Sequence, residues 1–370
     1  PFTGLPTPHR IERAEVVLQE GLPVVNSSDW VELRFAPEIQ VPGDAWAEWD
    51  PVEQRFITVA EKYPQGVTAR RKSVVYYPED LFEKLKWHDG SRFSPADVVL
   101  GIILSFDRGY EESPVFDPTE KPVVDSIMRT FKGVKIRSVD PLVIESYGDD
   151  FALDAERNIE PWFPVYLLGQ APWHSLALGI RAEASGELAF SAYKADLMGV
   201  EWANFVAGPS LAILARHLRE AQATGYVPYE PTLGRFLTED EVRARWTNLL
   251  SWYGQKGHFW LGTGPFYVER VYPVEKIVHL KRYPDYPDPA GRWDRFAEPM
   301  ISDVEVTGAR RVVVGAPAAF EVEVTFEGEP YPAEAIADVK FLIVNARGDV
   351  VLAGSAEEAG EGLYEIALTG

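Results

Sequence analysis

Histidine and aspartate stand next to each other at His88 and Asp89, the pair in this chain that most resembles an acid/base couple. The following Gly90 makes the same segment a turn signal, because glycine tolerates the positive φ that tight turns require. A turn needs no chemistry from these side chains, so we predict a structural role for them. The other histidines lack metal-site spacing, so no metal site is expected. They are His9, His174, His217, His258 and His279.

Carboxylates gather between residues 107 and 120, where five of them could offer oxygen ligands to a calcium ion. Their spacing lacks the regularity of a calcium-binding loop, which favours a solvated loop instead. The five are Asp107, Glu111, Glu112, Asp117 and Glu120. The chain has no cysteine, and therefore no disulfide, thiolate metal site or cysteine nucleophile. Motifs of hydrolases and of nucleotide-binding proteins are also absent, so we expect neither an enzyme nor a cofactor.

Aromatic residues make up 12% of the chain, with 11 Trp, 16 Tyr and 19 Phe, and they could line a ligand cleft. Such a cleft needs flat apolar walls and a few polar anchors. The aromatic clusters supply six candidate ligand-binding residues: Trp46, Trp49, Trp202, Trp252, Tyr253 and Trp260. Packing in a hydrophobic core is the favoured alternative for any single one of them.

Composition limits the classes of function. The 370 residues carry 36 Lys plus Arg and 57 Asp plus Glu, a formal net charge of −21, so no nucleic-acid partner is expected. No run approaches 18 apolar residues, and we expect neither a membrane-spanning helix nor a signal peptide. Because residue 1 is proline, we interpret the chain as an internal piece of a longer precursor. The 29 prolines and few Asn and Gln residues favour a thermophilic source.

The pattern of apolar residues predicts mixed α/β structure up to about residue 300, although the proline-rich first 45 residues suggest no element. Ser94, Pro95 and Asp97 form a helix start, and the apolar residues that follow predict a buried helix. Two more helices are predicted at 210–224 and from Thr238 to a stop at Gly254. Strands are predicted at 54–60, 73–77, 134–136, 142–145, 266–271 and 276–281.

The sequence pattern changes from about residue 301, where short apolar runs alternate with Gly- or Pro-containing turns. This part has 4 basic and 13 acidic residues, and no helical pattern. Six runs in 70 residues predict a small immunoglobulin-like β-sandwich. They lie at 304–306, 311–314, 320–326, 339–345, 350–353 and 364–368. We therefore expect two domains, 1–300 and 301–370.

Three segments in order resemble one known family. Residues 86–99 read KWHDGSRFSPADVV, residues 262–268 read GTGPFYV, and residues 281–286 read KRYPDY. These segments resemble the motifs of the family 5 extracellular solute-binding proteins, which are the oligopeptide, dipeptide and nickel receptors of bacterial ABC importers. The strand pair within 134–145 also resembles a part of that family, so the likeness covers roughly residues 55–300.

This resemblance implies a lobe of the type II periplasmic-binding-protein fold, followed here by the immunoglobulin-like segment. It implies a monomeric, extracytoplasmic solute-binding protein that captures peptides or similar medium-sized solutes by hinge closure, without chemistry. The partner would be the membrane permease of an ABC transporter. The location would be periplasmic or extracellular, with a membrane tether in the full-length protein.

The chain also departs from the family. Members usually exceed 500 residues, and the C-terminal lobe, which carries the carboxylate that commonly receives a peptide's amino terminus, has no counterpart here. The resemblance implies that the motif segments belong to the scaffold and do not contact the ligand. A cell-surface structural or adhesion module, built on a degenerate receptor-like scaffold, is therefore the alternative function.

Overall fold

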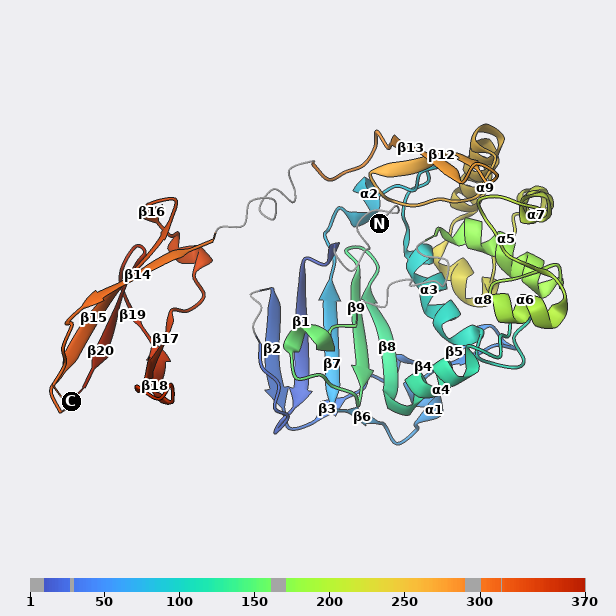
Figure 1. Cartoon of the computed structure of the whole chain (residues 1–370). Helices are drawn as coiled ribbons and strands as arrows, with labels where there is room; N and C mark the ends of the chain where they lie inside the picture. Colours follow the sequence, from blue (N-terminus) through green and yellow to red (C-terminus); the bar gives the residue numbers. More distant parts are fainter. Residues whose placement is uncertain (1–9, 27–29, 161–170, 290–300, 314, 370) are drawn as a thin grey trace. The chain divides into compact units, whose positions relative to one another are not determined.

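The computed structural model of the chain describes residues 10–26, 30–160, 171–289, 301–313 and 315–369. These residues form a mixed α/β structure with several β-sheets, which confirms the expected class at that level. The chain divides into two compact units, 1–287 and 288–370 (Figure 1). The domain boundary expected at residue 300 lies outside the described residues.

A seven-stranded sheet is the centre of the first unit, in the order β2-β1-β7-β9-β8-β4-β5. Its strands are β1 (Arg13–Gln19), β2 (Val31–Ala36), β4 (Trp46–Asp50), β5 (Arg55–Thr58), β7 (Arg71–Tyr76), β8 (Phe131–Ser138) and β9 (Val143–Gly148). Strands β1 and β2 are parallel, and the other neighbours are antiparallel. All residues of β9 are buried, so both faces of the sheet are covered at its middle.

Three short strand pairs also belong to this unit. They are β3 (Ile39–Gln40) with β6 (Thr68–Ala69), β10 (Leu188–Ala189) with β11 (Glu201–Trp202), and β12 (Phe266–Tyr272) with β13 (Ile277–Arg282). The last pair confirms the hairpin predicted at 266–281, whereas the strands of the first 45 residues were not predicted. Strand 54–60 is confirmed only in β5, because its end turns into helix α1 after the capping residue Thr58.

Most helices of this unit lie on the β8–β4–β5 side of the sheet (Figure 1). They are α1 (Val59–Lys62), α2 (Leu81–Lys84), α3 (Pro95–Asp107), α4 (Lys121–Thr130), α5 (Trp173–Ala184), α6 (Ala192–Met198), α7 (Ser210–Thr224), α8 (Glu230–Leu233) and α9 (Glu239–Lys256), with 3₁₀ turns at Ala155–Asn158 and Gly234–Phe236. Helices α5, α7 and α9 pack against one another, and α3 contacts both α5 and β4. Within the described ranges, none of the helices has the length and apolar character needed to cross a membrane.

The predicted helix starts are confirmed, but one predicted stop is wrong. In α3 the Asp97 carboxylate accepts a hydrogen bond from the Ser94 backbone N–H at 2.9 Å, and Pro95 is the first helical residue. Helix α9 starts after Thr238 but runs through Gly254 to its C-cap at Gly257, where φ is 76°. Gly254 is tolerated inside the helix because one glycine costs only about 1 kcal/mol there.

The second unit is built from strands, as predicted. They are β14 (Asp303–Gly308), β15 (Ala318–Phe326), β16 (Glu329–Pro330), β17 (Lys340–Val344), β18 (Val350–Ser355), β19 (Glu357–Gly360) and β20 (Leu363–Leu368), with a 3₁₀ turn at Ala333–Ala335. A five-stranded sheet contains β14-β15-β20-β19 with β16 beside β15, and a second sheet contains β17 and β18. The strand predicted at 311–314 is wrong for residues 311–313, and residue 314 lies outside the described residues.

Candidate functional site

The two conspicuous motif segments dock onto each other through His88. The His88 backbone N–H donates to the Gly262 carbonyl at 3.0 Å, and the Gly262 N–H donates to His88 Nδ1 at 3.2 Å. On the other side of the ring, His88 Nε2 lies 3.0 Å from the Gly264 carbonyl. Segments separated by 174 residues are thus joined by a backbone and a side-chain hydrogen bond between the same two residues.

The hydrogen bonds around His88 assign its protonation. Nδ1 accepts a hydrogen bond, so Nε2 must carry the proton that is donated to the Gly264 carbonyl. Burial lowers the pKa of His88 to about 4, which keeps the ring neutral. Two further bonds join the first segment to the third, 281–286: the Tyr283 hydroxyl donates to the Trp87 carbonyl at 2.9 Å, and Lys86 pairs with Asp285 at 3.0 Å.

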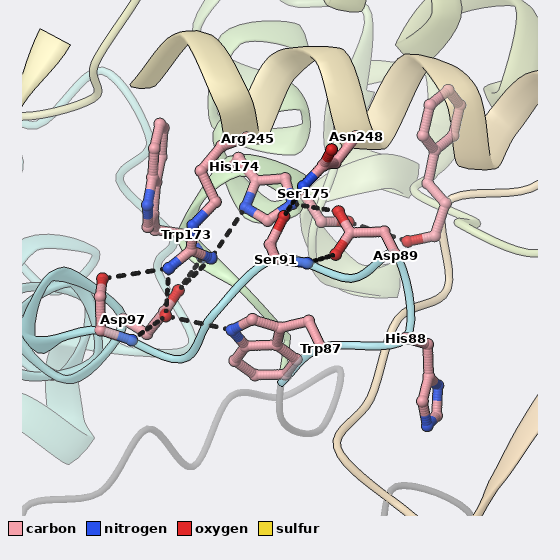
Figure 2. A network of polar contacts seen from close by, with 12 residues as sticks. Trp87, His88, Asp89, Ser91, Asp97, Trp173, His174, Ser175, Arg245 and Asn248 are labelled. Atoms are coloured by element: carbon pink, nitrogen blue, oxygen red, sulfur yellow. Dashed lines mark hydrogen bonds and ion pairs between the residues drawn. The ribbon is translucent and has the colours of Figure 1, made fainter. Parts of the chain in front are cut away.

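Residues 86–94, between α2 and α3, form a loop that we name the motif loop, and a buried ion pair between Asp97 and Arg245 lies beside it (Figure 2). The Arg245 side chain is 2% exposed and that of Asp97 is 0% exposed, and Arg245 Nη2 lies 2.9 Å from Asp97 Oδ2. Asp97 also accepts hydrogen bonds from the Trp87 indole at 3.1 Å and from the Trp173 backbone N–H at 2.8 Å. One carboxylate therefore connects the starts of α3 and α5 with α9 and the motif loop.

His174 links this pair to Asp89. Arg245 Nη1 donates to His174 Nδ1 at 3.2 Å, so the proton on Nε2 is donated to Asp89 Oδ2 at 2.8 Å (Figure 2). Burial lowers the pKa of His174, which is consistent with a neutral ring between a cation and an anion. The Ser91 N–H binds the other Asp89 oxygen at 2.9 Å, and the Asn248 amide binds the Ser91 hydroxyl at 3.1 Å.

His174 and Asp89 are paired like the histidine and the acid of a catalytic triad, but His174 has no ring nitrogen left for a nucleophile. A triad histidine keeps one ring nitrogen for the nucleophile, and here Arg245 already occupies it. In His88 both ring nitrogens are likewise used by backbone groups. These contacts are what the predicted structural role of His88 and Asp89 requires.

Two hollows flank the motif loop along α9. The first, of about 530 Å³, is lined by Phe82, by Gly90, Ser91, Arg92, Phe93 and Ser94 of the loop, and by Asp240, Glu241, Ala244, Arg245 and Asn248. The second, of about 290 Å³, is lined by His88, Asp89, Asn248, Ser251, Trp252, Gln255, Lys256, Tyr267, Tyr283 and Pro284. Asn248 belongs to both, so the hollows are neighbours.

The six predicted ligand-binding aromatics lie in different environments, which range from a hollow to the core and the surface. Trp252 alone lines one of these two hollows, while its neighbour Tyr253 stacks on Phe259 with ring centroids 4.4 Å apart. Trp260 is half-buried, and its backbone N–H donates to His258. Trp202 is 56% exposed and donates its indole N–H to the Phe190 carbonyl.

The other two aromatics belong to strand β4 and pack in the core. Trp49 is 1% exposed, and its indole N–H donates to Asp107 at 2.7 Å. Trp46 stacks on Phe56 with ring centroids 4.4 Å apart. Within the described ranges, no ring contact links these two tryptophans to Trp252, so the structure does not bring the predicted residues into one site.

The acidic segment at 107–120 is only partly the solvated loop that was predicted. Asp107 and Asp117 have fully buried carboxylates, the first bound by Trp49, Ser113 and Tyr229 and the second paired with Arg108 at 2.9 Å. The prediction of a solvated loop is wrong for Asp107 and Asp117, because hydrogen-bond donors of the protein, and not water, bind their carboxylates. Among the residues that the structure describes, no cluster of three potential metal ligands occurs.

Arg245, His174 and Asn248 were not predicted as members of any site. Each lies far from the motif loop in sequence, and Arg245 is 148 residues from Asp97. Only the spacing of Arg245 between the buried apolar residues of α9 could have indicated that it faces inward. A scan against protein-family models and a search of curated proteins both find no match for this chain.

Proposed function

We propose that the first unit is the scaffold lobe of an extracytoplasmic solute-binding protein, which captures peptides or similar medium-sized solutes for an ABC-importer permease. The observation that carries this proposal is the docking of the two motif segments through His88. A receptor scaffold needs its distant segments held rigidly, and here the shared motifs supply the contacts between them. Capture would proceed by hinge closure around the solute.

The chemistry of the buried network favours capture without bond cleavage. A general base must reach the proton that it abstracts, and both ring nitrogens of His88 and of His174 are engaged by other groups. Asp97 is likewise fully occupied by hydrogen-bond donors. A binding protein uses such a network to fix a loop, and this is the use that we propose here.

The finer fold and location follow from the same proposal. The first unit would be a lobe of the type II periplasmic-binding-protein class, and the second unit an immunoglobulin-like sandwich. The protein would act in the periplasm or outside the cell, held at the membrane in its full-length form, as a monomer that delivers solute to the permease.

A second candidate function is a surface adhesion or structural module. It is favoured by the apolar side chains that the second unit exposes on its strands, since large exposed apolar patches mark interaction surfaces. The exposed residues include Val304 and Val306 of β14 and Leu342, Val344, Val350 and Leu352 of β17 and β18. In this case the first unit would bind no solute.

Thermal unfolding with a library of short peptides separates the two functions. A ligand that binds only the folded chain raises its melting temperature, and at about 100 times Kd it stabilises the fold by about 2.7 kcal/mol. We expect a subset of peptides to shift the transition of the first unit. If no peptide shifts it while circular dichroism shows a folded chain, the receptor function is excluded and the adhesion function remains.

A further inference from the structure

Strand β2 is the outermost strand at one end of the seven-stranded sheet (Figure 1). The Glu20 N–H, next after β1, donates to the Ala36 carbonyl of β2 at 2.9 Å. Because backbone groups alternate in direction along a strand, the backbones of Val31, Leu33 and Phe35 face away from β1. Within the described ranges, the Leu33 and Phe35 backbones form no hydrogen bond on this outer edge.

The outer edge of β2 is open over most of its length. An open edge is a template on which another strand can pair, and proteins often block such edges. Here the Asn26 side-chain amide donates to the Val31 carbonyl at 2.7 Å, which covers one end of the edge. A carbonyl oxygen has two lone pairs, so Val31 can accept a second hydrogen bond. The stretch 31–35 is therefore available to a further strand.

The sequence of this stretch is complementary to itself in the antiparallel direction. Residues 31–35 read VELRF. When two copies pair with Leu33 opposite Leu33, Glu32 of each copy lies opposite Arg34 of the other. Val31 then lies opposite Phe35. In this register the outward-facing backbones form the hydrogen-bonded pairs of an antiparallel ladder, as the geometry of the edge requires.

The charged face of β2 stays balanced in this register. Glu32 and Arg34 already bind each other within the strand, with Arg34 Nε donating to Glu32 Oε1 at 2.9 Å, and their side chains are 50% and 61% exposed. Two paired copies place these four charges in a square in which each neighbour has the opposite sign. The pair within each strand is thus kept, and favourable pairs across the strands are added.

The other face of β2 is apolar. Val31 is 3% exposed, and Leu33 is partly buried against the same apolar cluster. Phe35 points to this face as well, because it is two residues further along the strand, and it is 45% exposed. Pairing sets Phe35 against Val31 of the second copy and the two Leu33 side chains against each other, so the apolar face continues across the edge.

Two edge strands of the second unit lack this complementarity. Strand β14 carries Asp303 and Glu305 and no basic residue, and β19 carries Glu357 and Glu358. A second copy on either edge would bring carboxylates together, and like charges destabilise a strand pair. The charge pattern therefore selects β2 over these two edges.

We propose that two copies of the chain pair through antiparallel β2 strands, with Leu33 at the two-fold axis, so that the sheet continues from one copy into the other. Such an interface uses the same patch on both copies, as two-fold dimers do. This inference goes beyond the proposed function, and its dimer takes the place of the monomer that the resemblance implies. Solute capture is unaffected, because no residue of β2 lines either hollow.

Sedimentation equilibrium of the full chain tests the proposal. The salt concentration should be about 0.15 M, where the repulsion between two chains of net charge −21 is largely screened. We expect the mass of two chains at about 100 µM, because one strand pair makes a small interface and a weak dimer. A folded chain with the mass of a monomer at this concentration overturns the proposal.

Charge-reversal variants identify the strands that pair. Glu32→Arg places arginines opposite one another and Arg34→Glu places glutamates opposite one another, so each is expected to weaken self-association at least tenfold. A mixture of the two variants should form a heterodimer in native mass spectrometry, since each pair across the strands then has opposite signs. Asp125→Arg, in the exposed pair with Lys121, is the control and should dimerise as the unmodified chain does.

The heterodimer separates pairing between copies from the ion pair within each strand, because mixing does not restore the latter. If each variant self-associates as the unmodified chain does, or if the mixture stays monomeric while circular dichroism shows folded chains, the β2 edge is not the interface. Peptide-induced shifts in melting temperature should be the same in all these variants. Their absence in every chain would overturn the receptor function and leave the dimer standing.

Discussion

At the scale of residues, His88 connects two motif segments through hydrogen bonds of its uncharged ring. Its Nδ1 accepts from Gly262, so a proton there would break a bond and place a charge in a buried site. Burial holds the pKa of His88 down to about 4, below its usual 6.5. The unfolded chain therefore binds a proton between these values that the folded chain does not, and stability falls as the pH falls through this window.

The pH dependence gives the first prediction. Between pH 7 and pH 4, His88 is expected to remove about 3 kcal/mol of unfolding free energy. Buried His174 and His258 have lowered pKa values and act in the same direction, so the test is a comparison with His88→Gln. Urea unfolding at several pH values should give a flatter profile for the variant, and parallel profiles would contradict this role.

The pair Asp97–Arg245 gives the second prediction. Removing one partner of a buried ion pair costs about 3–5 kcal/mol, because the other charge stays buried without compensation. Asp97→Asn is expected to lose this amount of unfolding free energy in urea. Asp125→Asn, in the exposed pair with Lys121, is the control and should lose less than about 1 kcal/mol. A loss below 1 kcal/mol for Asp97→Asn would show that the network does not stabilise the fold.

At the scale of elements, helix α9 lines the candidate site. The sequence pattern predicted that this helix stops at Gly254, whereas in the structure it continues to Lys256. Gly254 lies inside the helix with open space where the Cβ of an alanine would stand, whereas Gly257 has φ of 76°. Alanine should therefore stabilise position 254 by about 0.5–1 kcal/mol and destabilise position 257 by about 1–2 kcal/mol. Chemical unfolding of Gly254→Ala and Gly257→Ala checks the signs, and reversed signs would place the helix end at 254.

Local patterns predicted the elements that have local causes. Ser94 and Thr238 begin helices because their signals lie within four residues, and α7 has the predicted bounds because its apolar stripe is regular. The first strands were missed because β1 becomes buried only when it pairs with the distant β7, and the edge strand β2 is mostly exposed and pairs only with β1. The network of Arg245 was missed for the same reason, since no local pattern encodes a contact across 148 residues.

At the scale of the whole molecule, much of the net negative charge lies outside the unit that contains the candidate site. The second unit alone has 4 basic and 13 acidic residues from position 301 on, so its charge does not describe the candidate site. The candidate site lies wholly within the first unit, where the motif loop, α9 and the β12–β13 hairpin line it.

Calorimetric titration of the full chain with a short free peptide, followed by mass spectrometry of that peptide, tests whether the chain captures solute without cleaving it. We expect saturable binding of one peptide per chain, a negative heat-capacity change from apolar burial, and an intact peptide afterwards. The absence of heat at millimolar peptide with a folded chain would contradict capture, and a cleaved peptide would contradict binding without chemistry.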